Sequence, residues 1–179
     1  MTRTPWQHNS TAAAKPVART ASAPVYFTGA EVISTVPAKE FWASPSASAI
    51  RLASVEGVDG ASAVAVTVAP KREFFTIVEH QFPKAQVWSK RPWLFLEFRG
   101  KATGAVYSLS IALVGDRSVS YAFVDTTSGW SVLAFDLSNP DEGKAPGDTR
   151  VTSVRVASPS KDAAATFALG RLSISAPQR

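Results

Sequence analysis

The chain is divided into short apolar runs by glycine, proline and other turn-forming residues, and this spacing constrains its fold most strongly. Ala61–Ala69 alternates valine with small or polar residues, a period of two that fits a strand and would scatter apolar groups around a helix. Val106–Val114 alternates in the same way, and Gly115–Ser118 then forms a short turn into Val119–Phe123. Val outnumbers Leu by 19 to 9, which also favours strands because β-branched side chains pack well on pleated sheets.

The same pattern extends over most of the chain. About ten strands with frequent turns and no convincing amphipathic helix predict two packed antiparallel sheets. We expect an all-β fold, an antiparallel β-sandwich of jelly-roll type, over residues 24–179. The alanines of Asp162–Ala165 allow at most one helical turn. The remaining expected strands are Val25–Phe27, Glu31–Val36, Ile50–Val55, Phe74–Glu79, Pro92–Arg99, Trp130–Leu137, Val151–Ala157 and Phe167–Ser175.

Residues 1–23 have a different composition, with proline, serine, threonine and alanine around a few basic residues. We predict an extended basic arm, in which Arg3, Trp6, Lys15 and Arg19 make assembly contacts. Such a segment cannot bury enough surface by itself to offset its chain entropy, so we expect a neighbouring chain to hold it. The arm carries three of the five net positive charges, so the calculated pI says little about the folded domain.

Several function classes lack their residues. The chain has no cysteine and two histidines, which excludes thiolate chemistry and disfavours a multi-histidine metal centre. No phosphate-binding glycine loop or nucleophile elbow occurs, and the acids, Glu97 and Asp125 among them, are expected to be solvated or to form turns. A calcium ligand role for Asp136 or Asp162 is disfavoured because carboxylates are not clustered. We expect no enzyme activity, cofactor, metal or nucleic-acid partner.

Membrane insertion and ordinary export are also disfavoured. No apolar run is long enough to span a bilayer, and the first residues lack the apolar core of a secretory signal.

Five segments of the second half share one pattern of apolar strands with a few aromatic anchors: Trp88–Gly100, Tyr107–Leu109, Gly129–Ser138, Val151–Val156 and Thr166–Ile174. Together they resemble the galactose-binding-like β-sandwich of many carbohydrate-binding modules. The likeness covers roughly residues 88–175 and implies a jelly-roll fold, while the ligand is not implied because unrelated functions share this sandwich. In overall style, the cysteine-free chain rich in Ala, Ser and Val also looks like small virion proteins of tailed phages that infect actinobacteria.

Four aromatic residues are candidate contacts for a glycan or a partner protein: Trp88, Tyr107, Tyr121 and Trp130. Trp88 precedes an apolar strand, and an indole in a loop can stack on a sugar ring or anchor a protein. Tyr107 and Tyr121 share faces with apolar neighbours, so core packing is the default interpretation for both. A sugar platform is the alternative, if that face is an open concave surface. The surrounding stretch, Phe82–Lys101, is interpreted as core strand with a solvated basic rim.

These observations lead to two functional hypotheses. The first is a non-catalytic structural or adhesion module of a virion, such as a minor tail protein. Its arm would dock on other virion subunits or on copies of itself, and its body would contact cell-surface polysaccharide. The alternative is an extracellular carbohydrate-binding module of a secreted polysaccharide-degrading enzyme.

Overall fold

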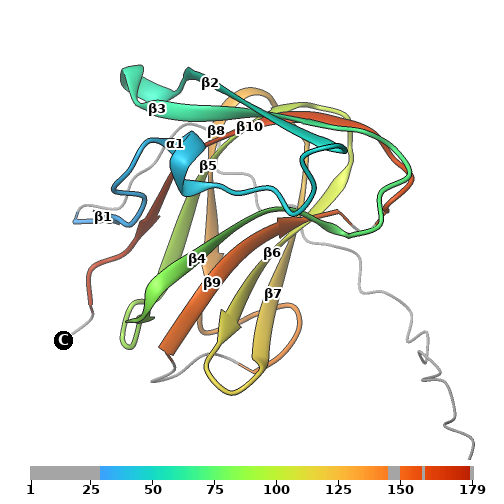
Figure 1. The fold of residues 1–179 in the computed structure, drawn as a ribbon. Helices are drawn as coiled ribbons and strands as arrows, with labels where there is room; N and C mark the ends of the chain where they lie inside the picture. Colours follow the sequence, from blue (N-terminus) through green and yellow to red (C-terminus); the bar gives the residue numbers. More distant parts are fainter. Residues whose placement is uncertain (1–28, 145–149, 159, 178–179) are drawn as a thin grey trace, which may run out of the picture.

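Two antiparallel sheets packed face to face make up the fold in the computed structural model (Figure 1). The structure describes residues 29–144, 150–158 and 160–177. Within these residues one sheet has the order β2-β3-β10-β5-β8, with β1 also paired to β10, and the other has the order β4-β9-β6-β7. The elements are β1 (Glu31–Val32), α1 (Ala38–Phe41), β2 (Ile50–Glu56), a 3₁₀ turn (Val58–Gly60), β3 (Ser62–Val68), β4 (Thr76–Val87), β5 (Trp93–Lys101), β6 (Val106–Leu113), β7 (Arg117–Val124), β8 (Ser128–Asp136), β9 (Arg150–Ala157) and β10 (Ala165–Ile174).

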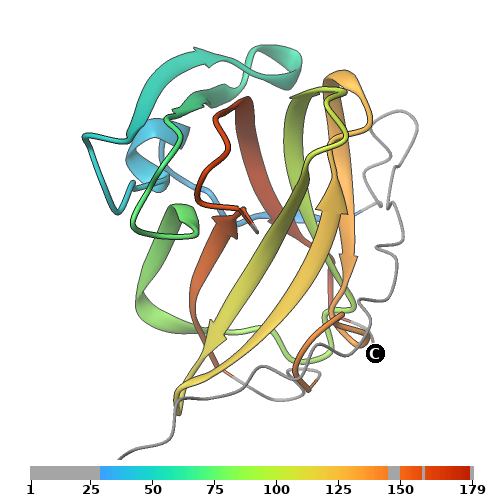
Figure 2. The same cartoon turned by 90° about the vertical axis from the view of Figure 1, so that its right-hand side faces the viewer.

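The core lies between the sheets and follows the alternation of the sequence. In β6 every second side chain is buried, from Tyr107 to Leu113, and the serines between them point away from the core. The β6–β7 hairpin pairs in continuous register from Val106↔Val124 to Leu113↔Arg117, and Figure 2 shows the two strands side by side. The predicted antiparallel jelly-roll sandwich and this hairpin are therefore confirmed.

Two sequence predictions about local structure are wrong. β4 was expected to end before Pro83, but it continues to Val87 because a bulge accommodates the proline. The short helix α1 was not predicted, since four residues after Pro37 are too few to show a helical period. Asp162–Ala165, for which the sequence allowed at most one helical turn, forms none. The strand Val25–Phe27 and the arm at residues 1–23 lie outside the described residues.

Asp125 fixes the loop between β5 and β6. Its buried carboxylate accepts hydrogen bonds from the backbone N–H groups of Lys101, Ala102 and Thr103 at 3.0–3.2 Å and from the Thr103 hydroxyl at 2.8 Å. Burial alone would raise the pKa of Asp125, but these hydrogen bonds outweigh it and lower that pKa. The expected turn-forming role of Asp125 agrees with this geometry.

Glu97 is buried, which corrects the expectation that it is solvated. It accepts a hydrogen bond from the Arg171 backbone N–H at 2.8 Å and forms an ion pair with the Arg171 side chain at 2.6 Å. The contact sits at an irregularity of β10 between Leu169 and Leu172, beside Gly170. Buried carboxylates need such partners, so Glu97 is explained as a structural group.

Candidate functional site: a pocket at the sandwich edge

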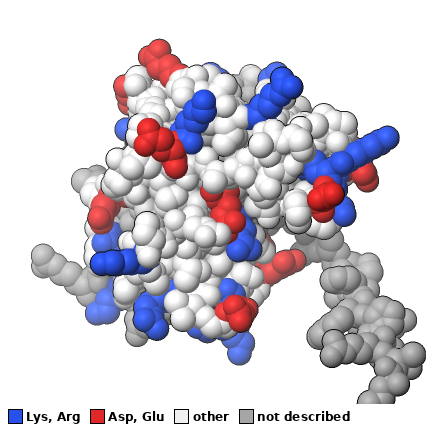
Figure 3. Space-filling view, in the orientation of Figure 1, with Lys and Arg blue, Asp and Glu red and all other residues white. Residues whose placement is uncertain are grey.

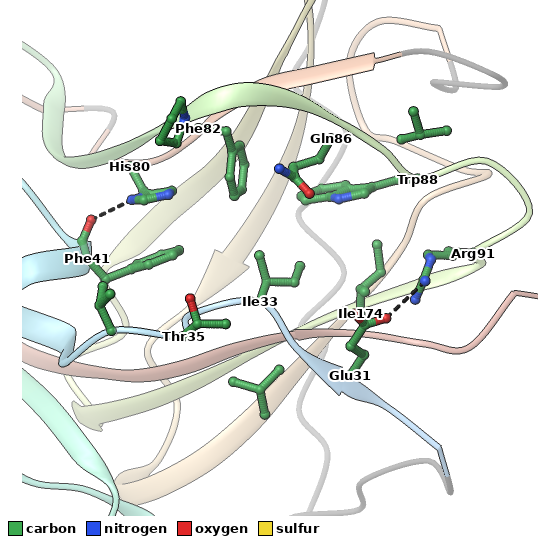
Figure 4. Close-up of a pocket in the computed structure, with 14 residues that line it drawn as sticks. Glu31, Ile33, Thr35, Phe41, His80, Phe82, Gln86, Trp88, Arg91 and Ile174 are labelled. Atoms are coloured by element: carbon green, nitrogen blue, oxygen red, sulfur yellow. Dashed lines mark hydrogen bonds and ion pairs between the residues drawn. The ribbon is translucent and has the colours of Figure 1, made fainter.

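A hollow of about 390 Å³ lies between β4, the edge strand of the four-stranded sheet, and the segment 31–36 that begins with β1 (Figure 4). This volume falls in the range of small-ligand pockets, roughly 300–1,000 Å³. We call the hollow the edge pocket, and it is lined by Glu31, Val32, Ile33, Thr35, Val36, Phe41, His80, Phe82, Pro83, Gln86, Val87, Trp88, Arg91 and Ile174.

One wall of the edge pocket is aromatic. The rings of Phe41 and His80 are stacked with centroids 3.7 Å apart, and His80 meets Phe82 edge-on at 4.7 Å. Phe82 in turn contacts Trp88 edge-on at 5.9 Å. Phe41 comes from α1 and the other three from β4 and the residue after it, so two distant segments build one continuous wall (Figure 4).

A bulge in β4 gives this wall its shape. Between Gln81 and Gln86 the chain advances five positions while its partner β9 advances from Ser153 to Val151 only. Pro83 lies in the bulge, where its missing N–H costs no ladder hydrogen bond. The Gln86 side-chain amide donates to the Lys84 carbonyl at 3.0 Å and braces the bulge. Its side-chain carbonyl oxygen is thus left as an acceptor at the pocket.

His80 supplies a second acceptor. Its Nδ1 lies 2.8 Å from the Phe41 carbonyl oxygen, and because a carbonyl can only accept, Nδ1 carries the proton. Burial lowers the pKa of His80 and the Phe41 carbonyl only partly opposes this, so the ring is neutral at neutral pH. Nε2 of that tautomer is an acceptor.

Arg91 and Glu31 form the other end of the edge pocket. Their side chains pair at 2.9 Å, and Arg91 Nη1 also donates to the Ser175 carbonyl at 3.0 Å. Arg91 is largely buried, whereas the Glu31 side chain is 66% exposed. The site therefore offers an aromatic wall, two neutral acceptors and one fixed guanidinium.

The four aromatic candidates from the sequence are distributed over different parts of the fold. Trp88 is 6% exposed and lines the edge pocket, so it is not the open loop residue that the sequence indicated. Tyr107 and Tyr121 lie in the core, at 3% and 0% exposure, so neither presents a ring face to solvent. Trp130 is half-buried on β8, with the Arg99 guanidinium 5.1 Å from its ring centre.

The four predicted arm contacts, Arg3, Trp6, Lys15 and Arg19, lie outside the described residues.

Sequence reasoning missed most of the edge pocket. Phe82 and Arg91 were included in the stretch interpreted as core and solvated rim, and His80 was considered only for a metal centre or a pair of acid/base imidazoles, both of them disfavoured. The signal that could have found the site is Pro83 inside an apolar strand pattern, because an internal proline marks a bulge or an edge.

The outer face of the four-stranded sheet offers different chemistry. Glu79 and Arg155, cross-strand partners on β4 and β9, form an ion pair at 2.8 Å. Burial raises the pKa of Glu79, but hydrogen bonds from Arg155 and Ser153 and the Arg155 charge outweigh it, so the net shift is downward. The two ion-paired side chains begin a row of polar groups across the sheet, which continues to Ser110 on β6 and Ser120 on β7. The Ser120 hydroxyl lies 3.1 Å from the Glu142 carboxylate. This row contains polar groups and no aromatic ring.

The described residues hold no group of three or more His, Asp or Glu side chains placed to bind a metal ion. No helix among them is long and apolar enough to cross a membrane.

The fold is the jelly-roll β-sandwich found in carbohydrate-binding modules. A family 11 carbohydrate-binding module from Clostridium thermocellum, in complex with a β-1,3-1,4-mixed-linked tetrasaccharide, superposes with a TM-score of 0.63 at 15% identity. The alignment covers 88% of this chain and 99% of that module. A second structure of a family 11 module, from a cellulosomal cellulase of the same organism, has a TM-score of 0.60 at 13% identity. Its alignment covers 88% of this chain and 98% of that module.

Larger enzymes contain the same fold as one part. An exo-β-agarase matches with a TM-score of 0.60 at 9% identity over 85% of this chain and 25% of the enzyme. No family model and no curated protein sequence matches the chain. At these identities the likeness establishes the fold alone.

Proposed function

We propose that this protein is a non-catalytic carbohydrate-binding module that holds part of a polysaccharide in the edge pocket. The observation that carries the proposal is an aromatic wall beside neutral acceptors in one concave site: the half-buried rings of His80 and Phe82 are open to a ligand, and the buried rings of Phe41 and Trp88 support them from behind. A sugar ring has C–H faces that pack on aromatic rings and hydroxyl groups that need hydrogen-bond partners. The fold adds support, since its structural neighbours include modules named for carbohydrate binding.

The lining of the pocket favours binding over hydrolysis. Glycoside hydrolysis ordinarily uses two carboxyl groups on either side of the scissile bond. Glu31 is the one acid among the described residues that line the edge pocket, and it is paired with Arg91. A site of this composition can hold a sugar but lacks the acid and base for cleaving it.

This proposal takes the alternative of the two sequence hypotheses and not the first. The virion hypothesis depended on an arm at residues 1–23, which lies outside the described residues, and no observation on the described residues favours it. A virion location, with the arm docked on neighbouring subunits, stays a prediction. Deleting residues 1–23 and measuring incorporation into particles tests it.

The binding proposal is tested by isothermal titration with a panel of soluble polysaccharides and by matched substitutions. We expect micromolar to millimolar affinity for at least one polysaccharide. Phe82→Ala should weaken that affinity about two- to tenfold, because aromatic contacts contribute roughly 0.5–1.5 kcal/mol beyond simple burial. Phe74→Ala is the matched control, since Phe74 is 51% exposed and lies outside the pocket lining.

Two results would contradict the proposal. One is the absence of binding to any member of the panel by the folded wild-type protein. The other is binding that Phe82→Ala and Phe74→Ala weaken equally, since this would place the ligand elsewhere.

A further inference from the structure

We propose that the edge pocket selects a glycan that carries carboxylate groups, a uronic-acid oligosaccharide, and that Arg91 binds the carboxylate in exchange for Glu31. This inference rests on the proposed function and names the class of ligand for the same site. Its basis is the Arg91–Glu31 ion pair, in which the chain's own carboxylate occupies the place of a ligand carboxylate (Figure 4).

Arg91 is a fixed anchor. Its Nη1 donates to the Ser175 carbonyl at 3.0 Å, and its backbone N–H donates to the Trp88 carbonyl at 3.2 Å. Its side chain is 19% exposed, so the guanidinium is held at the pocket and still reaches the opening. A guanidinium fixed in this way has lost most of its rotamer freedom before any ligand arrives, and its planar donors suit a carboxylate.

Glu31 is a replaceable partner. It belongs to β1, which spans two residues, and its side chain is 66% exposed. Among the described residues, the contact with Arg91 is the only polar side-chain contact of Glu31. Because the Glu31 end of the ion pair is open to water, the pair contributes little to stability, and a ligand carboxylate displaces Glu31 at small cost.

The charge around the pocket favours an anion. The segment from Phe82 to Arg91 contains Lys84 and Lys90, both exposed, and no acid. Figure 3 shows basic side chains, with acidic ones between them, around the lower left of the molecule, where β4 ends in Figure 1. These lysines raise the local concentration of a polyanionic chain and make its binding depend on salt.

The rest of the pocket requires a sugar and not merely an anion. Next to Arg91, the ring of Trp88 and the side chain of Ile33 line the site, and the Nε2 acceptor of His80 lies further along. A uronic acid ring presents a carboxylate, a C–H face and hydroxyl groups together. It therefore uses all three kinds of group that the pocket offers.

The test compares each acidic sugar with its own neutral form. Trisaccharides of galacturonate, mannuronate and glucuronate are titrated beside the same trisaccharides reduced at the carboxyl group to the neutral hexose. We expect at least one acid to bind about tenfold more tightly than its reduced form, the gain typical of a charge-assisted hydrogen bond. Added salt should reduce that preference.

Two substitutions assign the preference to this ion pair. Glu31→Gln frees Arg91 and should raise affinity for the acid about two- to fivefold, without changing affinity for the reduced form. Arg91→Gln should abolish the preference for the acid. Glu56→Gln is the matched control, because Glu56 lies at the end of β2, outside the pocket lining. If circular dichroism shows that Arg91→Gln is unfolded, the affinity of Glu31→Gln for the acid alone decides whether the ion pair sets the preference, since this variant leaves Arg91 in place.

The outcomes separate this inference from the proposed function. Equal binding of acidic and reduced trisaccharides, or an unchanged affinity for the acid in Glu31→Gln, overturns the inference and leaves the carbohydrate-binding proposal standing. Binding of a hexaglutamate peptide as tight as that of the acidic sugar also overturns it, because the pocket would then recognise a carboxylate without a sugar. Absence of binding to every polysaccharide and trisaccharide overturns both.

Discussion

Replacing Asp125 by asparagine removes one of the two acceptor oxygens that organise the β5–β6 loop, and we expect a loss of about 2 kcal/mol in the free energy of unfolding. Asp125 is 1% exposed, and its carboxylate accepts from three backbone N–H groups and one hydroxyl. Asparagine keeps one acceptor oxygen and places an amide nitrogen, which cannot accept, opposite the remaining donors. With the oxygen at the Oδ2 position the Ala102 N–H loses its partner, and with the oxygen at the Oδ1 position the Thr103 N–H loses its partner, while the Lys101 N–H reaches either oxygen. Either orientation therefore leaves one backbone donor without an acceptor. Each orientation costs about 1–3 kcal/mol, reduced where the loop admits water.

Asp136→Asn is the matched control. Asp136 also accepts two hydrogen bonds, from the Ser138 N–H at 2.9 Å and the Ser138 hydroxyl at 2.6 Å, but it lies at the more exposed end of β8. Water replaces those contacts, so the control should lose less than about 1 kcal/mol. Both variants are compared with the wild type by urea unfolding, followed by tryptophan fluorescence near neutral pH.

Two pH measurements follow from the same contacts. The pKa of Asp125 is lowered from 3.8 in the folded protein, so its contribution to stability is present above that value and is lost as the pH falls below it. Asp125→Asn should lack this acid-dependent loss of stability.

Burial and the Asp125 charge raise the pKa of Tyr107 to about 12. Removing that charge should lower the Tyr107 pKa, which is measured from tyrosinate absorbance in an alkaline titration. The reasoning fails if Asp125→Asn is as stable as Asp136→Asn and the Tyr107 titration does not move.

Three further predictions concern other sites. A Cβ added at Gly170 would lie 2.9 Å from the Glu97 Cβ, so Gly170→Ala should cost at least about 2 kcal/mol by urea unfolding, and a smaller loss would mean that β10 shifts easily. The folded-state pKa of His80, read from an NMR titration of its ring, should lie below 6.5, so its stability contribution is present above pH 6.5 and lost as the pH falls. A value above 6.5 contradicts the neutral ring and its Nε2 acceptor. Deleting Pro83–Ala85 should convert the β4 bulge into a regular ladder, leaving the protein folded but without glycan binding, whereas retained binding would separate the ligand from the bulge.

The parts of the fold that the sequence predicted well are those in which period two is uninterrupted. The alternation in Ala61–Ala69 and Val106–Val114 identified β3 and β6, because one face of each strand is buried along its length. The burial of Tyr107 and Tyr121 also follows the default interpretation from their apolar neighbours. The end of β4 was misplaced because a proline normally terminates a strand, and a bulge is visible only when the partner strand is known.

The edge pocket could not be predicted because it depends on contacts between distant segments. Phe41 and His80 are 39 positions apart. In its local sequence Phe41 looks like an ordinary apolar residue and His80 like an ordinary polar one. Glu31 and Arg91 likewise meet only because β1 pairs with the end of β10, beside the start of β5. Local patterns of residue type contain no information about such proximity, so the site had to come from the three-dimensional fold.

Backbone amide NMR during titration with trigalacturonate is the most direct test of where this protein holds a sugar. Binding in the edge pocket predicts that the largest shift changes fall on residues 31–36 and 80–91, which form its two walls. Shift changes centred instead on Ser110, Ser120 and Arg155 would place the ligand on the outer face of the four-stranded sheet and contradict the account.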